Sequence, residues 1–242
     1  MPVEQAIEYV QDVRRRMKGA GRAEVGGQRV LAHLEAMRGR LDTARELLAA
    51  SRALAEELGL EVLLAASVQR TAGEVELLAG NAAAAEAVLR TACDSLERRG
   101  DWGHYTSLAP LLAEALRRQG RAEEAAEPLE KSARTALADD VEAQTSLLRV
   151  RARILADRGE LDEAERVARA GIEALARTDY IDPHASALDD LGAILASKGE
   201  LEEARAALEK ALALHEQKGN LVLAARTRER LALDGLGARQ AG

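Results

Sequence analysis

Few residues in this chain of 242 are of the types that carry chemistry, and their spacing does not assemble a site. The histidines are His33, His104, His184 and His215, and the single cysteine is Cys93. The sequence has no His-x-x-x-His or Cys-x-x-Cys pair, so it predicts no metal site and no cofactor. Cys93 is expected to be a small packing residue rather than a reactive thiol.

Paired carboxylates and a small aromatic cluster are the remaining candidates. Asp189-Asp190 and Glu202-Glu203 are neighbours in sequence. Because neighbouring residues on a helix diverge by about 100°, we interpret both pairs as solvated surface. The segment Trp102–Tyr105 could anchor a ligand, but packing at a turn between repeats is the favoured interpretation. Since no Gly-x-x-x-x-Gly-Lys-Ser/Thr phosphate loop occurs either, the sequence predicts that the protein is not an enzyme.

A short motif that recurs five times organises the chain. Each copy starts with a glycine and has an alanine five residues later. The glycines are Gly39, Gly80, Gly120, Gly159 and Gly199, and the alanines are Ala44, Ala85, Ala125, Ala164 and Ala204. The steps between successive glycines are 41, 40, 39 and 40 residues. A nearly constant period of this length is typical of stacked two-helix units rather than of a single globular core.

The last unit indicates how the motif lies between two helices. Asp182 and Pro183 suit the start of a first helix. Gly199 is expected to end that helix, because glycine readily adopts the left-handed conformation beyond a helix C-terminus. Carboxylates then begin the second helix, where they favour the positive end of the helix dipole. Ala204 is expected to be small because the two helices of a pair approach closely there.

The same pattern predicts an all-α protein with about twelve helices. They are expected near residues 3–18, 25–38, 41–58, 60–79, 81–99, 104–119, 122–137, 140–158, 161–177, 183–198, 201–217 and 220–234. The array over 1–234 would contain an orphan second helix (3–18), repeat units near 25–58, 60–99, 104–137, 140–177 and 183–217, and a terminal helix (220–234), before a disordered tail (235–242). Pro110 is expected to mark a late helix start, and Pro128 to kink its helix.

Composition and charge exclude several classes of function. Apolar residues make up 47% of the chain and aromatic residues only 2%, with no Phe, which favours helix layers packed by Ala and Leu. The net charge of −7 arises within residues 122–242, because residues 1–121 balance to zero. This charge disfavours general nucleic-acid binding. A single cysteine and the lack of a long apolar run predict a cytoplasmic protein without a membrane partner.

On these residues the chain resembles the tetratricopeptide (TPR) repeat family. In that family the first helix of a unit carries a Leu-Gly pair, a glycine follows it, and an alanine opens the second helix. Leu191-Gly192, Gly199, Ala204 and Leu208 lie in that register. A period near 40 rather than 34, and Leu and Ala in place of the usual Trp and Phe, are departures. HEAT repeats share the longer period but lack this motif. The resemblance implies a right-handed superhelix of antiparallel helix pairs that acts in protein–protein interaction.

Residues 72–81, 112–116 and 138–141 are similar to a particular bacterial example. It is the C-terminal TPR arm of signalling regulators that join an adenylate/guanylate cyclase domain to an AAA-type ATPase. The resemblance implies a partner-sensing regulatory arm, present here as a fragment or as a free-standing descendant, and cyclase activity is not carried over. Two alternatives stay open: a free-standing scaffold or peptide-binding adaptor, and part of a transcriptional regulator without its own DNA-binding segment.

In a TPR stack the first helices line the inner face. Carrying the register across the units predicts nine side chains in that groove: Arg29, His33, Arg70, Glu74, Glu114, Arg118, Arg149, Arg153 and Asp189. Five of them are arginines, which suit bidentate contacts with carboxylates, so the groove is expected to bind an acidic peptide or a carboxylate terminus. Because the end helix at residues 3–18 would leave apolar surface uncovered, a homodimer through that helix is also expected.

Overall fold

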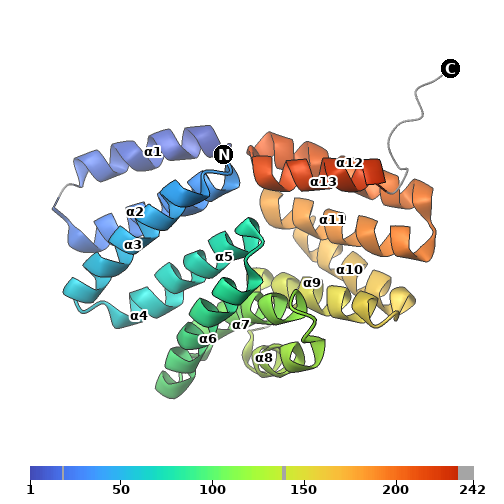
Figure 1. The fold of residues 1–242 in the computed structure, drawn as a ribbon, viewed down its shortest axis with the longest axis horizontal. Helices are drawn as coiled ribbons and strands as arrows, with labels where there is room; N and C mark the ends of the chain where they lie inside the picture. The colour runs from blue at the N-terminus through green and yellow to red at the C-terminus, as the bar shows by residue number, and fades with distance from the viewer. Residues whose placement is uncertain (18, 138–139, 234–242) are drawn as a thin grey trace. The chain divides into compact units, whose positions relative to one another are not determined.

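Regular structure in the computed structural model, which describes residues 1–17, 19–137 and 140–233, is entirely helical (Figure 1). The elements are α1 (Val3–Arg16), α2 (Gly21–Met37), α3 (Leu41–Glu57), α4 (Glu61–Leu63), η1 (Leu64–Gln69), α5 (Arg70–Ala79), α6 (Ala82–Arg99), α7 (Trp102–Arg117), α8 (Ala122–Thr135), α9 (Val141–Asp157), α10 (Leu161–Leu175), α11 (Ile181–Lys198), α12 (Leu201–Lys218) and α13 (Leu221–Leu233). Since α4, η1 and α5 form one continuous rod, the described residues contain the twelve helices that the sequence predicts, and the all-α class is confirmed.

Helix ends agree closely with the sequence prediction. The largest difference is at α2, which begins at Gly21 rather than near residue 25. The predicted tail at residues 235–242 lies outside the described residues. None of the described helices combines the length and the apolar character that crossing a membrane requires.

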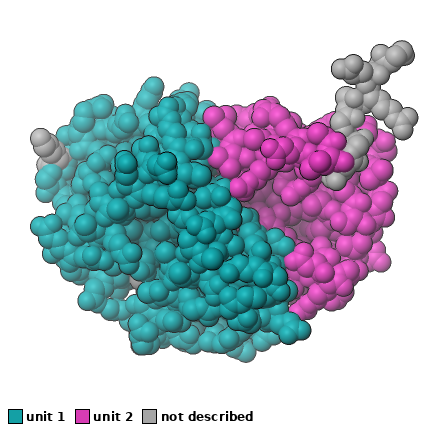
Figure 2. All heavy atoms as spheres, viewed as in Figure 1, with its two compact units in different colours: residues 1–137 teal, residues 138–242 magenta. Residues whose placement is uncertain are grey.

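The helices pack as antiparallel pairs in two compact units (Figure 2). Unit 1 is residues 1–137 and contains α1 to α8, whereas unit 2 is residues 138–242 and contains α9 to α13. We call the helix before each recurring glycine an A helix and the helix after it a B helix. The A helices are α2, the α4–η1–α5 rod, α7, α9 and α11, and their B helices are α3, α6, α8, α10 and α12. The sequence predicted one array across both units.

Small residues hold each A helix against its B helix. The five alanines that open the B helices, Ala44, Ala85, Ala125, Ala164 and Ala204, are all completely buried. In unit 2, Ala204 belongs to a core that also contains Leu191, Leu195 and Leu208. The glycine that ends α11, Gly199, has a φ of 83°, the left-handed conformation that the sequence predicted there. The recurring motif therefore fixes both the turn and the closest approach within a pair.

An extra residue explains the longest step of the repeat. Four A helices take 19 residues from N-cap to glycine (20 to 39, 101 to 120, 140 to 159 and 180 to 199), whereas the α4–η1–α5 rod takes 20 (60 to 80). The rod absorbs this residue in the π-helical segment η1, Leu64–Gln69. A π-helical segment lets residues on both sides of an insertion keep their core positions.

Pro110 does not mark a late helix start, because α7 begins eight residues earlier, at Trp102. A proline inside a helix lacks the N–H that would bond to the carbonyl four residues back, here that of Thr106. The Ser132 hydroxyl of α8 donates a hydrogen bond to this carbonyl (3.3 Å), which accounts for a buried proline in α7. Pro128 lies inside α8 and is buried. The kink predicted at Pro128 stays a prediction.

Replacing Gly73 by alanine tests the close approach of paired helices. A Cβ at Gly73 would lie 2.5 Å from Cγ of Leu89 on the B helix, so the two helices would have to separate. We expect Gly73→Ala to lower the free energy of unfolding by about 1–3 kcal/mol, measured by urea denaturation. Gly26→Ala is the matched control, because a Cβ there meets nothing within 4 Å. It should be neutral or stabilise by up to about 1 kcal/mol. Equal effects of the two substitutions would contradict this packing.

Candidate partner-binding face

Four of the nine predicted groove residues come together in unit 1, between α2 and α5. Arg70 Nε donates a hydrogen bond to Glu74 Oε1 (3.1 Å), and His33 Nδ1 of α2 lies 3.3 Å from Glu74 Oε2. Arg29 Nη1 donates to the hydroxyl of Thr71 (3.3 Å). We call these five residues the α2–α5 cluster. It joins two consecutive A helices through polar side chains.

The carboxylate of Glu74 is the electrostatic centre of this cluster. Burial raises its pKa, but the contacts with His33, Arg70 and Arg29 outweigh burial and hold the pKa of Glu74 at about 2. Burial also lowers the pKa of Arg29, and this effect exceeds the opposing attraction of Glu74. Glu74 is therefore ionised at neutral pH and compensates only part of the surrounding positive charge.

Glu114 and Arg118 form a second cluster on α7. Arg118 Nε donates to Glu114 Oε1 (2.6 Å), and Arg117 Nε donates to Glu114 Oε2 (2.8 Å). Arg118 Nη1 also donates to the backbone carbonyl of Leu77 on α5 (2.8 Å). Glu114 is almost completely buried. We call Glu114, Arg117 and Arg118 the α7 cluster, which repeats the pattern of two arginines around one carboxylate.

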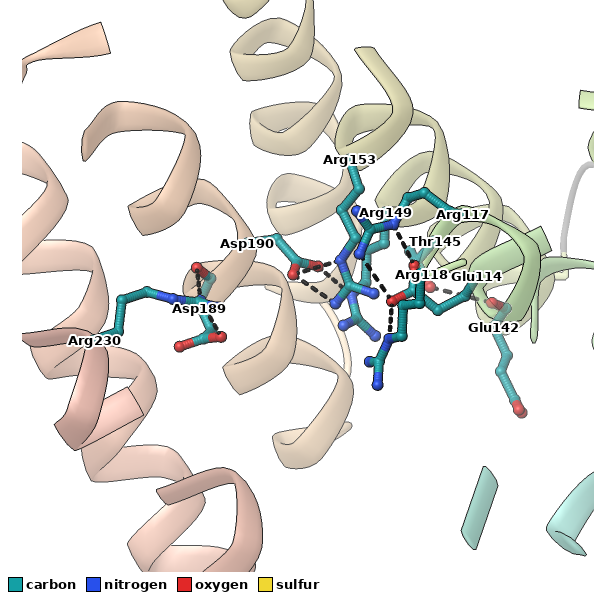
Figure 3. Close-up of polar contacts among 10 residues, drawn as sticks. All are labelled: Glu114, Arg117, Arg118, Glu142, Thr145, Arg149, Arg153, Asp189, Asp190 and Arg230. Atoms are coloured by element: carbon teal, nitrogen blue, oxygen red, sulfur yellow. Dashed lines mark hydrogen bonds and ion pairs between the residues drawn. The ribbon is translucent and has the colours of Figure 1, made fainter. Parts of the chain in front are cut away.

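Arg149 and Arg153 form a third cluster, in unit 2, around a carboxylate that the sequence analysis assigned to solvent (Figure 3). Arg149 Nε donates to Asp190 Oδ2 (3.0 Å), and Arg153 Nε donates to Asp190 Oδ1 (2.7 Å). Asp190 is only 6% exposed, so its interpretation as solvated surface is wrong. The reason is that α11 turns this residue toward the two arginines of α9. Arg149, Arg153 and Asp190 form the α9–α11 cluster.

Asp189 is placed apart from the arginines of α9. Its Oδ2 accepts a hydrogen bond from Arg230 Nη1 of α13 (2.6 Å), and its Oδ1 accepts one from the Thr227 hydroxyl (2.8 Å). Figure 3 shows Asp189 and Asp190 leaving α11 in different directions. We call Asp189 and Arg230 the α11–α13 pair. It balances one positive against one negative charge.

The three clusters share a composition that the sequence did not reveal. Each has two arginines and one carboxylate, so each carries an excess of positive charge in a chain whose net charge is −7. The sequence register found five of the six arginines in these clusters and missed Arg117. It also missed four partners on A helices or on α13: Thr71, Asp190, Thr227 and Arg230. The sequence held one signal for Asp190. This residue directly follows Asp189, a predicted groove residue, and it lies on the helix that carries the Leu191-Gly192 pair of the repeat motif.

The other chemistry-bearing residues form packing contacts. Burial and the nearby Asp94 and Glu97 raise the pKa of Cys93 to about 12, so the nucleophilic thiolate is disfavoured. The rings of Trp102 and Tyr105 meet edge to face with centroids 5.6 Å apart, and Tyr105 is buried. Among the described residues, no group of three or more His, Cys, Asp or Glu side chains could hold a metal ion.

Comparison with known protein families identifies the repeat. Two family models, both described as Tetratricopeptide repeat, match the chain, one at residues 184–218 and the other at residues 25–50, 111–131 and 145–170. The matched segments lie in both units and cover residues of A and B helices. The chain therefore contains TPR repeats, although its period near 40 is longer than the roughly 34 residues usual for that family. No curated protein matches the sequence.

Solved structures with the same fold agree with this assignment. NprR in complex with its cognate peptide NprX has 15% identity and a TM-score of 0.75, over 99% of this chain and 70% of that one. The apo form of the quorum sensor NprR from B. thuringiensis has 16% identity and a TM-score of 0.58, over 93% of this chain and 65% of that one. BtubC (BKLC) from P. vanneervenii has 15% identity and a TM-score of 0.59, over 100% and 95%. At these identities the likeness establishes the fold alone.

Neutralising Glu74 tests the electrostatics of the α2–α5 cluster. A carboxyl whose folded-state pKa is about 2, against an ordinary 4.5, stabilises the fold above pH 4.5 and loses that contribution as the pH falls toward 2. We expect Glu74→Gln to lower the free energy of unfolding by about 1–3 kcal/mol at pH 7. In urea titrations the gap from wild type should shrink by pH 3, whereas Glu202→Gln, at an exposed carboxylate, should matter little at either pH. A gap of equal size at pH 7 and pH 3 would contradict the assignment.

Proposed function

We propose that this protein is a non-catalytic module that binds an acidic protein or peptide segment through the polar side chains of its A helices. We call the side chains of the α2–α5, α7 and α9–α11 clusters the A-helix face. The observation that carries the proposal is the repeated excess of arginine. Three clusters on A helices each hold two arginines with one carboxylate, while the chain as a whole is acidic. Guanidinium groups that are held in place by an internal carboxylate need little reordering to bind a second carboxylate, supplied by a partner.

TPR repeats and the similar structures support a protein or peptide partner. One of those structures holds NprR with its cognate peptide NprX, and another is described as a quorum sensor. We infer that the present chain acts in an analogous way, as the partner-sensing arm of a bacterial signalling regulator. A ligand that favours one conformation of such an arm would shift the population of the regulator's states. A free-standing scaffold or adaptor, and part of a transcriptional regulator, are the alternatives.

A homodimer through α1 stays a prediction. Tyr9 on this helix is 61% exposed, and Met17, the residue directly after the helix, is 47% exposed. They line an apolar cavity of about 200 Å³ between α1 and α2, together with Val13 and Val30. These residues are where such a contact would form.

Neutralising the α9–α11 cluster tests the proposed function. The triple variant Arg149→Gln/Arg153→Gln/Asp190→Asn removes the excess charge but leaves side chains that can form hydrogen bonds. It is preferable to reversing the arginines to Glu, which would crowd carboxylates around the buried Asp190. We expect the affinity for a rhodamine-labelled N-acetyl hexaglutamate peptide to fall about tenfold at low ionic strength, measured by fluorescence anisotropy.

The matched control neutralises the α11–α13 pair. Asp189→Asn/Arg230→Gln removes one positive and one negative charge from the same face, so peptide affinity should stay within about twofold of wild type. Circular dichroism and thermal melting establish that both variants are folded. Undiminished binding by the folded triple variant would contradict a role for this cluster. Failure of the wild type to bind hexaglutamate would contradict an acidic partner altogether.

A further inference from the structure

We propose that the α2–α5 cluster is an anion-binding position whose affinity is set by the protonation of His33. The inference rests on the function proposed above and names the residue that would tune one of its contact points. The cluster differs from the other two in containing an imidazole, the side chain that changes charge between pH 5 and 8. A partner carboxylate would meet two guanidinium groups at high pH and a third positive group once His33 is protonated.

The geometry places His33 where its charge would act on both the internal carboxylate and a bound one. Its Nδ1 lies 3.3 Å from Oε2 of Glu74, while Arg70 occupies the other oxygen of that carboxylate. The His33 and Arg70 side chains are 35% and 30% exposed, so both stay accessible from the A-helix face. Protonated His33 would pair with Glu74 and neutralise part of its charge. Arg29 and Arg70 would then attract an external carboxylate more strongly.

Within the described residues, the ion pairs on α2 and on the elements that surround it, apart from His33 itself, join arginines to carboxylates. The helices packed against α2 are α1, α3 and α5. Charged contacts between helices here are those of Arg38 with Glu4 of α1 (3.0 Å), Glu24 with Arg14 of α1, and Arg45 of α3 with Glu76 of α5 (2.8 Å). Further pairs lie along the same helices and at their ends: Arg15 and Arg16 with Asp12, Arg38 and Arg40 with Glu35, Arg45 with Asp42, and Arg52 with Glu56. Each of these contacts pairs an arginine with a carboxylate, and side chains of these two types ordinarily keep their charge between pH 6 and pH 8. Among the side chains named at this position, His33 is the one of a type that ordinarily changes charge in that interval.

The α7 and α9–α11 clusters provide an internal comparison. Their charged members are arginine, glutamate and aspartate only. Arginine and carboxylate side chains keep their charge between pH 6 and pH 8. A pH dependence of anion binding in this interval should therefore trace to the α2–α5 cluster, and it should be strongest at low ionic strength, where exposed charges are least screened.

The experiment measures the affinity of the full chain for the same rhodamine-labelled N-acetyl hexaglutamate peptide at pH 6 and pH 8. The peptide side chains stay ionised at both values. We expect the wild type to bind about fivefold to tenfold more tightly at pH 6 than at pH 8 at low ionic strength. His33→Gln should bind with the weaker affinity at both pH values. His33→Arg, which is always charged, should bind with the tighter affinity at both.

His104→Gln is the matched control. His104 also lies against a carboxylate, with Nδ1 2.8 Å from Asp101 Oδ2, but at the start of α7 and away from the cluster. This variant should keep the pH dependence of the wild type. Binding that is equal at pH 6 and pH 8 in the wild type would overturn the role of His33 and leave the proposed function standing. So would a pH dependence that survives in His33→Gln. No binding at any pH would overturn both proposals.

Discussion

The close approach of each A helix to its B helix is the constraint on which the rest of this structure depends. A single amphipathic helix cannot bury its apolar stripe alone, and in this alanine-rich chain, which has no Phe, the stripe is shallow. Pairing therefore requires small residues at the contact. Ala204 is completely buried, and at Gly192 a Cβ would lie 2.5 Å from Leu208. Because these contacts fix the rotation of each A helix, they also decide which polar side chains face the neighbouring A helix.

Charged side chains then join consecutive A helices to one another within each of the two compact units. Asp190 links α11 to two arginines of α9, and Glu74 links α5 to His33 of α2. A buried carboxylate would be costly alone, and several charge-assisted contacts offset that cost. In the function proposed above, the same arrangement would also serve recognition, since each cluster holds two arginines for one carboxylate. Contact between repeats and binding of an acidic partner would then rest on the same side chains.

The sequence predicted the helices well and the polar contacts only in part. Glycine and alanine at a nearly constant period define the turn and the contact within each A–B pair, so the helix ends at those turns follow from local rules. Some partners of an arginine, in contrast, lie on another helix, as Asp190 does for Arg149 at a separation of 41 residues. A rotation of about 100° separates Asp189 from Asp190. The sequence analysis placed Asp189 in the groove and did not identify Asp190, which accepts the hydrogen bond from Arg149. Likewise the step of 41 residues does not say where the additional residue lies, and the structure places it in the π-helical segment η1.

The most direct test of the central claim, that the A-helix face is the contact surface, is an NMR titration of arginine side chains. The Nε–H signals would be followed as hexaglutamate is added to isotope-labelled protein. The account predicts that signals of Arg29, Arg149 and Arg153 shift, while those of the outward-facing Arg52 and Arg166 on B helices stay in place. Shifts confined to the B-helix arginines would contradict it.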